Sequence, residues 1–147
     1  ERADRYHMLF KDAGILDIVS LPAARPYNRH VFNQYIIRVK KRDALREYLS
    51  NQGVGTEIYY PVPLHLQQCF KYLGYKKGDF PVSEKAAKET LALPIYPELT
   101  PEEQKYVVGK IDEFYMKTYL RELKVLRMLF LVLGTINNES ALKFAPR

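Results

Sequence analysis

The sequence is poor in cysteine and tryptophan, with one cysteine, Cys69, and no tryptophan among 147 residues. A single thiol cannot form an internal disulfide or a thiolate zinc cluster, which excludes a disulfide-stabilised extracellular scaffold and fits a reducing compartment. The chain also lacks an apolar stretch of the roughly 18 to 20 residues that cross a bilayer. We therefore expect a cytoplasmic protein without a membrane span, in which Cys69 is a buried thiol rather than a nucleophile.

The chain also lacks an initiator methionine and a targeting pattern, because it begins Glu1-Arg2-Ala3-Asp4. We expect a fragment or a processed product. With 47% hydrophobic residues and 12 tyrosines, the composition is typical of a globular chain that is long enough for one core.

A basic stripe is missing from most of the chain, although the net charge is +6. Residues 1 to 115 hold 17 Lys and Arg against 15 Asp and Glu, whereas residues 116 to 147 hold 6 against 2. Nucleic-acid modules concentrate basic residues on one face beside stacking aromatics or a recognition helix. The balanced charge of the first 115 residues therefore argues against a nucleic-acid partner.

Self-contained catalytic motifs are absent as well. The sequence has no Walker phosphate loop and no G-x-S-x-G elbow, and Gly53-Val54-Gly55 is too short for a dinucleotide fingerprint. The three histidines, His7, His30 and His65, are far apart and lack carboxylates at metal-ligand spacing. We expect no metal site and no serine or cysteine hydrolase.

Hydrophobic periodicity predicts alternating helices and strands in the first half of the chain. Apolar residues up to Ala13 have helical spacing before Gly14, and residues 15 to 29 suggest an extended connector. Alternation over 30–39 predicts a strand with Tyr35, Ile37 and Val39 on one face. A helix is expected over 43–52, stopped by Gly53, and a second strand over 54–60, ended by prolines.

The second half of the chain is predicted to be mainly helical. Helices are expected over 64–73, over 81–91 and from Pro101, with a short apolar segment, 91–95, at a sheet edge or simply extended. The last helix has the clearest signal, because Thr100 and Glu103 match a capping box around a proline at the first helical position. This order indicates an α+β domain, with a short, mostly antiparallel sheet covered by helices.

Residues 116–147 form a basic and apolar extension of unknown role after the predicted domain, 1–115. Lys117, Arg121 and Lys124 recur at helical spacing and lead into six apolar residues. Two interpretations stay open: an amphipathic segment that binds a membrane surface, and a helix packed on another lobe or a partner chain.

The candidate binding residues lie in 59–65, where Tyr59, Tyr60 and His65 flank two prolines. Two phenols and an imidazole on a proline-stiffened loop offer polar tips on rigid bodies, which suits a polyhydroxylated or charged ligand. The alternative is that Tyr60 packs in the core and His65 only begins a helix. The residue types alone leave these two interpretations open.

Four separated blocks closely resemble the C-terminal lobe of the DegT/DnrJ/EryC1/StrS sugar aminotransferases, in the family's order and spacing. The blocks are 33–38 (NQYIIR), 53–65 (GVGTEIYYPVPLH), 78–84 (GDFPVSE) and 93–100 (LPIYPELT). The resemblance covers about residues 1 to 115. It implies the small lobe of a fold-type I enzyme that uses pyridoxal 5'-phosphate (PLP). Such enzymes convert a keto-sugar nucleotide to an amino-sugar nucleotide, with glutamate as the common donor, in polysaccharide or antibiotic-sugar biosynthesis.

The resemblance also implies where the chemistry lies. The family's Schiff-base lysine and the carboxylate on the cofactor ring belong to the large lobe, so we expect no catalytic or cofactor-binding residue in this chain and no activity of the fragment alone. In the family, the small lobe supplies a wall of the substrate cleft, often across a homodimer interface. Its loop commonly carries a His-Tyr or His-Phe pair, and here the pair is Tyr59-Tyr60.

The tyrosine at position 59 changes what this loop is expected to do. A phenol has an ordinary pKa of about 10 and cannot do the proton transfer of an imidazole, whose pKa is about 6.5. We therefore predict that Tyr59 binds and positions substrate through hydrogen bonds, together with Tyr60, His65 and Asn33. The Asn33-Gln34-Tyr35 form is similar to members that aminate the third carbon of the sugar, including those acting on N-acetylated glucuronic acid nucleotides.

Two other hypotheses remain open. One is a non-catalytic regulatory or binding protein built from this lobe alone, which needs a concave site of its own. The other is an unrelated interaction domain that docks through its basic, apolar tail, and whose binding survives the loss of Tyr59 and Tyr60.

Overall fold

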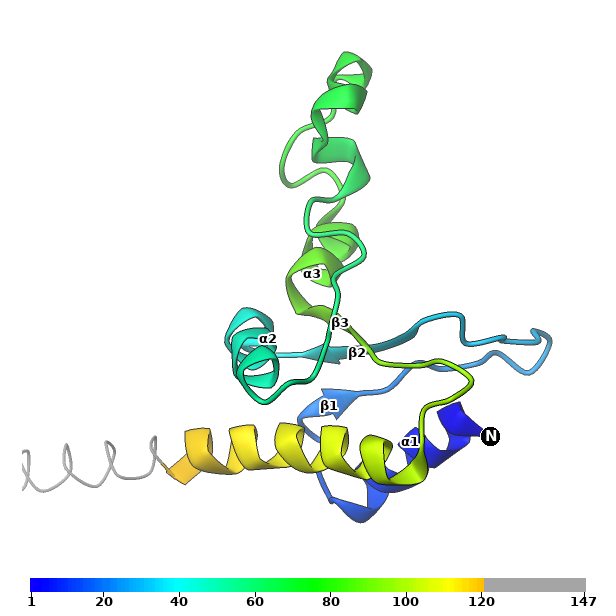
Figure 1. The fold of residues 1–147 in the computed structure, drawn as a ribbon. Coiled ribbons are helices and arrows are strands. Elements are labelled where there is room, and N and C mark those ends of the chain that lie inside the picture. The colour runs from blue at the N-terminus through cyan, green and yellow to red at the C-terminus, as the bar shows by residue number, and fades with distance from the viewer. Residues whose placement is uncertain (121–147) are drawn as a thin grey trace, which may run out of the picture. The chain divides into compact units, whose positions relative to one another are not determined.

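The computed structural model describes residues 1–120, and the chain divides into two compact units, Glu1–Asp112 and Glu113–Arg147. The first unit contains a small sheet and the helices packed on it (Figure 1). The predicted binding residues all lie in this first unit.

The sheet has three antiparallel strands in the order β1-β2-β3. They are β1 (Val19–Ser20), β2 (Tyr35–Val39) and β3 (Thr90–Leu93). Val19 pairs with Val39, and Tyr35 pairs with Leu93. An antiparallel sheet combined with helices confirms the α+β class predicted from the sequence.

The central strand β2 is shorter than the predicted strand 30–39, which was wrong at its start. Phe32 has a positive φ of 51°, a conformation that no strand residue adopts. Its N–H donates to Nδ1 of His30 at 2.9 Å, so this stretch forms a local turn instead of a ladder. The predicted alternation holds further along, because Tyr35, Ile37 and Val39 are buried while Ile36 and Arg38 are half-buried.

Helix α1 (Arg2–Asp12) packs on the buried face of β2. The rings of Tyr6 and Tyr35 lie 4.8 Å apart, and both residues are fully buried. Two polar contacts satisfy their hydroxyls, because Tyr6 donates to the carbonyl of Pro94 at 2.9 Å and the Tyr35 oxygen lies 3.1 Å from Nδ1 of His7. Burial raises the pKa of both phenols, so they remain neutral hydrogen-bonding groups.

Helix α2 (Arg42–Asn51) is the expected helix at 43–52, begun one residue earlier. Leu45 and Leu49 form its buried stripe. Gly53 follows with a φ of 75°, the left-handed stop that the sequence predicted.

Helix α3 (Pro81–Glu89) ends two residues before the predicted end at Leu91. Thr90 adopts extended angles, φ −79° and ψ 138°, and opens strand β3, whose residues pair with β2. Thr90 and Leu91, which helical spacing had assigned to the helix, therefore belong to strand β3. Segment 91–95 was expected at a sheet edge or simply extended. Strand β3 is one of the two outer strands of the three-stranded sheet.

The helix that begins at Pro101 has the predicted capping box. The Thr100 N–H donates to Oε2 of Glu103 at 2.8 Å, and the Glu103 N–H donates to the Thr100 hydroxyl at 3.2 Å. Val107, Val108 and Ile111 are buried, as their spacing predicted. Gln104 is also fully buried, and it donates to the carbonyl of Arg2 and accepts from Arg5, each at 2.9 Å.

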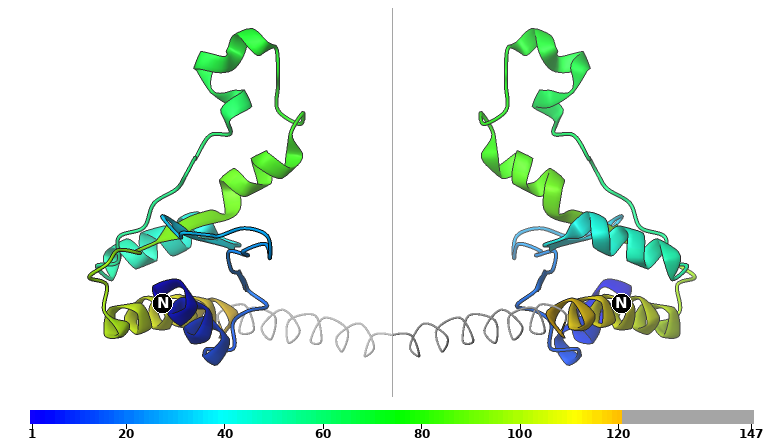
Figure 2. Two further views of the ribbon diagram at one scale, coloured as in Figure 1. Left: turned by 90° about the vertical axis from the view of Figure 1, so that its right-hand side faces the viewer. Right: turned by 90° about the vertical axis from the view of Figure 1, so that its left-hand side faces the viewer.

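A projecting segment, which we call the arm (residues 61–80), extends away from the sheet beyond α3 (Figure 2). It was predicted to contain an α-helix over 64–73. It has instead two 3-10 helices, η1 (Leu64–Leu66) and η2 (Gln68–Leu73), separated by Gln67 in an extended conformation. Neither buries a residue, so no packed stripe sustains an α-helix here. Cys69 is exposed, and the expectation of a buried thiol was wrong.

The second unit is described only at residues 113–120, which are helical. Burial raises the pKa of Tyr115 to about 12. No helix within residues 1–120 has the length and hydrophobicity needed to cross a membrane. Most of the extension, 121–147, lies outside the described residues, so both interpretations of it remain predictions.

Candidate functional site

The candidate site is built on residues 55–60, which run beside β3. The sequence predicted a strand over 54–60, but the structure has a single bridge, in which the N–H and carbonyl of Glu57 bond to Ala92 at 3.2 and 2.8 Å. The next N–H, of Ile58, is taken by the Glu57 carboxylate at 2.9 Å instead of by a neighbouring strand. No further bridge to β3 follows, and residues 58–60 continue as a loop that leads to Pro61.

This loop and the start of β2 enclose a hollow of about 370 Å³, which we call the Tyr59 hollow. It is lined by Asn33, Gln34, Gly55, Thr56, Glu57, Tyr59 and residues 92–95. Two of the predicted binding residues, Asn33 and Tyr59, thus come together although they are distant in sequence. The lining side chains offer two amides, one alcohol, one phenol and one carboxylate, a set suited to hydrogen-bonding hydroxyl groups.

A second, smaller hollow adjoins Tyr59 on the side of α3. It measures about 200 Å³ and is lined by Tyr59, Tyr60, Pro63, Leu64, Ser83, Ala86, Ala87 and Thr90. Tyr59 is 45% exposed and Tyr60 is 60% exposed. The interpretation that Tyr60 packs in the core was therefore wrong, and both phenols are accessible to a ligand.

His65 is separated from these hollows and holds the arm to α3. Its side chain is 8% exposed, its Nε2 lies 3.2 Å from Oε1 of Glu84, and its ring contacts Phe80 at 4.8 Å between centroids. The Gly78 N–H also donates to Glu84, at 2.7 Å, and this bond, with the one from His65, holds the pKa of the carboxyl below its ordinary value. The surroundings of His65 indicate a structural contact rather than an open binding group.

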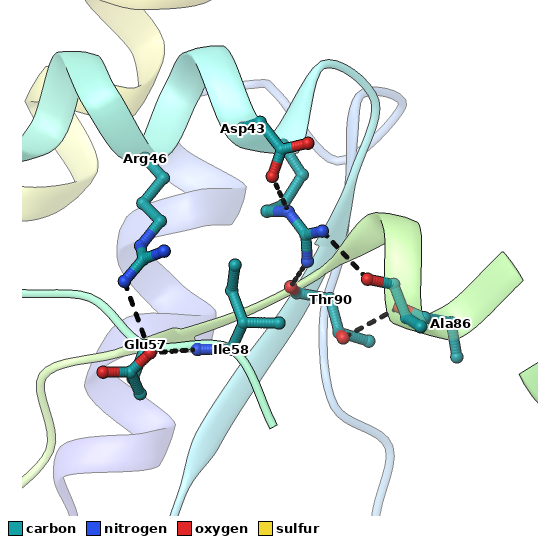
Figure 3. A network of polar contacts seen from close by, with 8 residues as sticks. Asp43, Arg46, Glu57, Ile58, Ala86 and Thr90 are labelled. Carbon is teal, nitrogen blue, oxygen red and sulfur yellow. Dashed lines mark hydrogen bonds and ion pairs between the residues drawn. The ribbon is translucent and has the colours of Figure 1, made fainter. Parts of the chain in front are cut away.

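Two arginines of α2, one helical turn apart, hold the walls of the site (Figure 3). Arg42 is 6% exposed, and it donates to the carbonyls of Ala87 and Thr90 at 2.9 and 2.7 Å and to Asp43 at 2.7 Å. Arg46 is exposed, and its Nη2 lies 3.4 Å from Oε1 of Glu57. Arg42 thus connects α2 to the junction of α3 and β3, whereas Arg46 lies near Glu57, the residue that bridges to β3.

Sequence reasoning missed Glu57 and Thr56 as lining residues. The polar residues of the 54–60 segment carried the signal, because an interrupted ladder leaves such side chains at an open edge. The alternation of residues does not reveal that the pairing with β3 is limited to one bridge at Glu57.

A larger hollow, of about 620 Å³, lies away from the predicted residues. Its lining is Gly53, Val54, Gly55, Pro94, Tyr96, Leu99, Glu102, Glu103, Tyr106 and Val107. It is predominantly apolar, and the Glu103 carboxylate there is already engaged by Thr100. The polar groups that suit a sugar gather instead in the Tyr59 hollow.

The side chains that line the Tyr59 hollow offer hydrogen-bonding groups to a ligand. Among residues 1–120, the lining of the two hollows at Tyr59 includes no lysine, the residue type that holds PLP as a Schiff base. Within residues 1–120 there is also no group of three His, Cys, Asp or Glu side chains arranged to hold a metal ion.

Relatives of this chain are aminotransferases and proteins named for regulation. A "pleiotropic regulatory protein" of Geobacillus stearothermophilus is 51% identical over 115 residues, which are 78% of this chain and 31% of that protein. The dTDP-3-amino-3,6-dideoxy-alpha-D-galactopyranose transaminase of Aneurinibacillus thermoaerophilus is 34% identical over 96 residues, 65% of this chain and 26% of that protein. The chain thus spans about a third or less of the length of these relatives.

A solved structure has the same fold over the first unit. DesV of S. venezuelae, crystallised in complex with a ketimine intermediate, matches with a TM-score of 0.66 and 29% identity, covering 76% of this chain and 31% of DesV. The profile of the DegT/DnrJ/EryC1/StrS aminotransferase family matches residues 1–112, and the family and its solved members are PLP-dependent aminotransferases. This chain therefore belongs to the DegT/DnrJ/EryC1/StrS aminotransferase family.

Proposed function

We propose that this chain acts as the C-terminal lobe of a PLP-dependent sugar-nucleotide aminotransferase and forms one wall of its substrate cleft. The observation that carries the proposal is the Tyr59 hollow, where Asn33 and Tyr59 meet beside Thr56 and Glu57. Their amide, hydroxyl and carboxylate groups suit the hydroxyls of a sugar ring. The names of the relatives, which include a transaminase of a dTDP-linked amino sugar, point to the same substrate class.

In this proposal, a part of the enzyme that this chain does not include holds PLP and supplies its lysine. PLP, when bound, withdraws electrons from the carbon whose amino group is transferred. The lining of the Tyr59 hollow, which has no lysine, supports this division of labour. Glutamate is the expected amino donor, and a homodimer is the expected assembly, as is common where a cleft is formed between lobes.

Within this cleft, Tyr59 and Tyr60 are proposed to orient the sugar through their hydroxyls, together with Asn33. Tyr59 lines both hollows and Tyr60 lines the smaller one, so a ring placed at Tyr59 reaches both phenols. The fourth predicted residue, His65, contributes indirectly, because its contact with Glu84 holds the arm that follows Tyr60.

A hybrid enzyme tests this proposal. Residues 1–112 would replace the matching segment of the A. thermoaerophilus transaminase, and the hybrid would be assayed with that enzyme's sugar nucleotide and glutamate. We expect transamination by the hybrid and none by the 147-residue chain alone. Tyr59→Phe in the hybrid should raise KM several-fold, because a hydrogen bond to substrate is lost. Tyr72→Phe, at an 80% exposed arm position outside both hollows, is the matched control.

A hybrid that binds PLP and folds but aminates no sugar nucleotide would contradict the proposal. An unchanged KM for Tyr59→Phe and Tyr60→Phe would leave the lobe assignment standing and remove the two tyrosines from substrate binding.

A non-catalytic regulatory or binding protein is the second candidate, favoured by the printed name of the G. stearothermophilus relative. It requires a concave site in the lobe whose ligand binding is itself the function, without a large lobe. The two candidates differ in the polypeptide found in cells: an antibody against residues 42–80 would detect a chain of more than twice this mass for the enzyme, and one of 17.2 kDa for the binding protein.

A further inference from the structure

We propose that Glu57 is a specificity-determining residue of the Tyr59 hollow, where its carboxylate accepts hydrogen bonds from a neutral sugar ring and disfavours a ring that bears a carboxylate. The inference rests on the proposed function, because it takes the hollow to be the place where the sugar of a nucleotide sugar lies.

The position of Glu57 is fixed from its backbone and from one carboxylate oxygen. Two backbone hydrogen bonds to Ala92, at 3.2 and 2.8 Å, hold the residue against β3. Its Oε1 accepts from the N–H of Ile58 at 2.9 Å and lies 3.4 Å from Nη2 of Arg46. These contacts orient the carboxylate before any ligand arrives, which reduces the entropy lost on binding.

The second oxygen is available to a ligand. Within the described part of the chain, the hydrogen bonds of this carboxylate all involve Oε1. The side chain is 56% exposed and lines the Tyr59 hollow. An ionised carboxylate only accepts hydrogen bonds, so Oε2 selects donors such as a sugar hydroxyl or an acetamido N–H.

The charge of Glu57 distinguishes it from the other polar residues of the hollow. Asn33, Gln34, Thr56 and Tyr59 are neutral and can both donate and accept, so they tolerate either kind of ring. A uronate ring would bring a second negative charge close to Glu57, where like charges repel. Arg46 compensates only partly, because it is 44% exposed, outside the lining, and screened by water. The hollow therefore favours a neutral ring over a uronate, in contrast to the uronate subgroup considered from the sequence.

Two nucleotide sugars that share everything except the carboxylate provide the test. The 147-residue chain, labelled with ¹⁵N, would be titrated with UDP-N-acetylglucosamine and with UDP-N-acetylglucosaminuronic acid, and the amide shifts of residues 33–34 and 55–59 followed. We expect the neutral nucleotide to bind several-fold more tightly than the uronate. Glu57→Gln removes the charge and keeps the shape, so the two affinities should become equal within about twofold.

Two further variants sharpen the result. Glu47→Gln, on the exposed surface of α2 and outside the hollow, makes the same change in net charge and should leave the preference as it is in the wild type. Arg46→Ala removes the partial compensation and should increase the preference for the neutral ring. This opposite shift keeps the inference testable if Glu57→Gln is poorly folded, which the dispersion of the same spectra reveals.

The outcomes separate the two proposals. If neither nucleotide shifts the signals of the hollow, the role of Glu57 in this lobe is overturned, and transamination by the hybrid enzyme decides the cleft wall separately. If both nucleotides bind there and Glu57→Gln or Arg46→Ala keeps the wild-type preference, the role of Glu57 is overturned and the sugar-binding wall stands.

Discussion

The body of the first unit and the arm, residues 61–80, are held together by different means. The body has residues with no exposed surface in α1, β2, α2, β3 and the helix from Pro101, for example Tyr6, Ile37 and Leu91. The two 3-10 helices of the arm bury no apolar residue, and Tyr72 in η2 is 80% exposed. Apolar burial therefore stabilises the body, whereas the arm depends on a few polar and ring contacts near its base.

This difference is relevant to the site, because the Tyr59 hollow and the smaller hollow beside it lie where the body and the arm join. Glu57 and Ala92 are bridged at the edge of the sheet. In contrast, Tyr60, Pro63 and Leu64, which line the smaller hollow, lead into the arm. A rigid sheet edge beside a loosely held arm suits a cleft wall that a second lobe completes. The exposed aromatics of the arm are then surfaces for contact with other parts of an enzyme.

Two leucines test the contrast between the body and the arm most directly. Leu91→Ala in β3 removes a fully buried side chain, and we expect a loss of about 3 kcal/mol in the free energy of unfolding. Leu64→Ala makes the same change in the arm at a position that is 54% exposed, and its effect should stay within about 0.5 kcal/mol. Urea unfolding followed by circular dichroism measures both, and equal losses would show that the arm is packed as firmly as the body.

Arg42→Ala tests the junction of α3 and β3, beyond the base of the arm. The guanidinium is the buried donor to the carbonyls of Ala87 and Thr90, so its loss leaves two acceptors without their partner. We expect the free energy of unfolding to fall by roughly 2 kcal/mol. Arg46→Ala, which removes an exposed ion pair on the same helix, should cost less than about 1 kcal/mol in the same urea titration. A larger effect at Arg46 would contradict the assignment of Arg42 as the buried tie.

The parts of the fold that the sequence predicted are those in which local pattern and tertiary packing agree. The alternation of Tyr35, Ile37 and Val39 marks a strand whose one face is buried, and the structure buries that face. The capping box at Thr100 and the left-handed Gly53 are local conformations, so neighbouring residues alone specify them.

The errors occur where a distant or unusual contact decides. Residues 54–60 alternate like a strand, but they pair with β3 only at Glu57. Residues 64–73 have helical spacing, but they bury no apolar residue, and Cys69 is exposed. Of the candidate site, Asn33, Tyr59 and Tyr60 could be chosen from sequence, whereas the place of Glu57 in the hollow depends on the broken ladder.

Thr100→Ala tests the capping box of the helix that begins at Pro101, a part of the body that neighbouring residues specify. Removing the hydroxyl leaves the Glu103 N–H without its cap, and we expect the free energy of unfolding to fall by about 1 kcal/mol. Thr100→Ser keeps the hydroxyl and is the matched control, expected to stay near the wild type. A thermal unfolding series on the three proteins measures the difference. Equal stability of the alanine and serine variants would remove the capping box from the forces that hold this helix.

The smallest effect on stability is expected from the polar contact between the arm and Glu84. It should be visible as a pH dependence of the protection of the arm. The Gly78 N–H, followed by His65, lowers the folded-state pKa of this carboxyl below its ordinary value of 4.5. A lowered folded-state pKa means that the contact stabilises the arm fully above pH 4.5 and loses this contribution as the pH falls through the folded-state pKa. Hydrogen exchange at the Gly78 amide should therefore show protection that declines below pH 4.5, while the body amides of β2 stay protected.

The Glu84→Gln variant is the control. Its side chain cannot titrate, so the protection of the Gly78 amide should change little over the same pH range. A Gly78 signal that follows the same pH profile in both proteins would mean that Glu84 does not hold the arm, and that the aromatic contacts of Phe80 with His65 and Tyr75 fix its base instead.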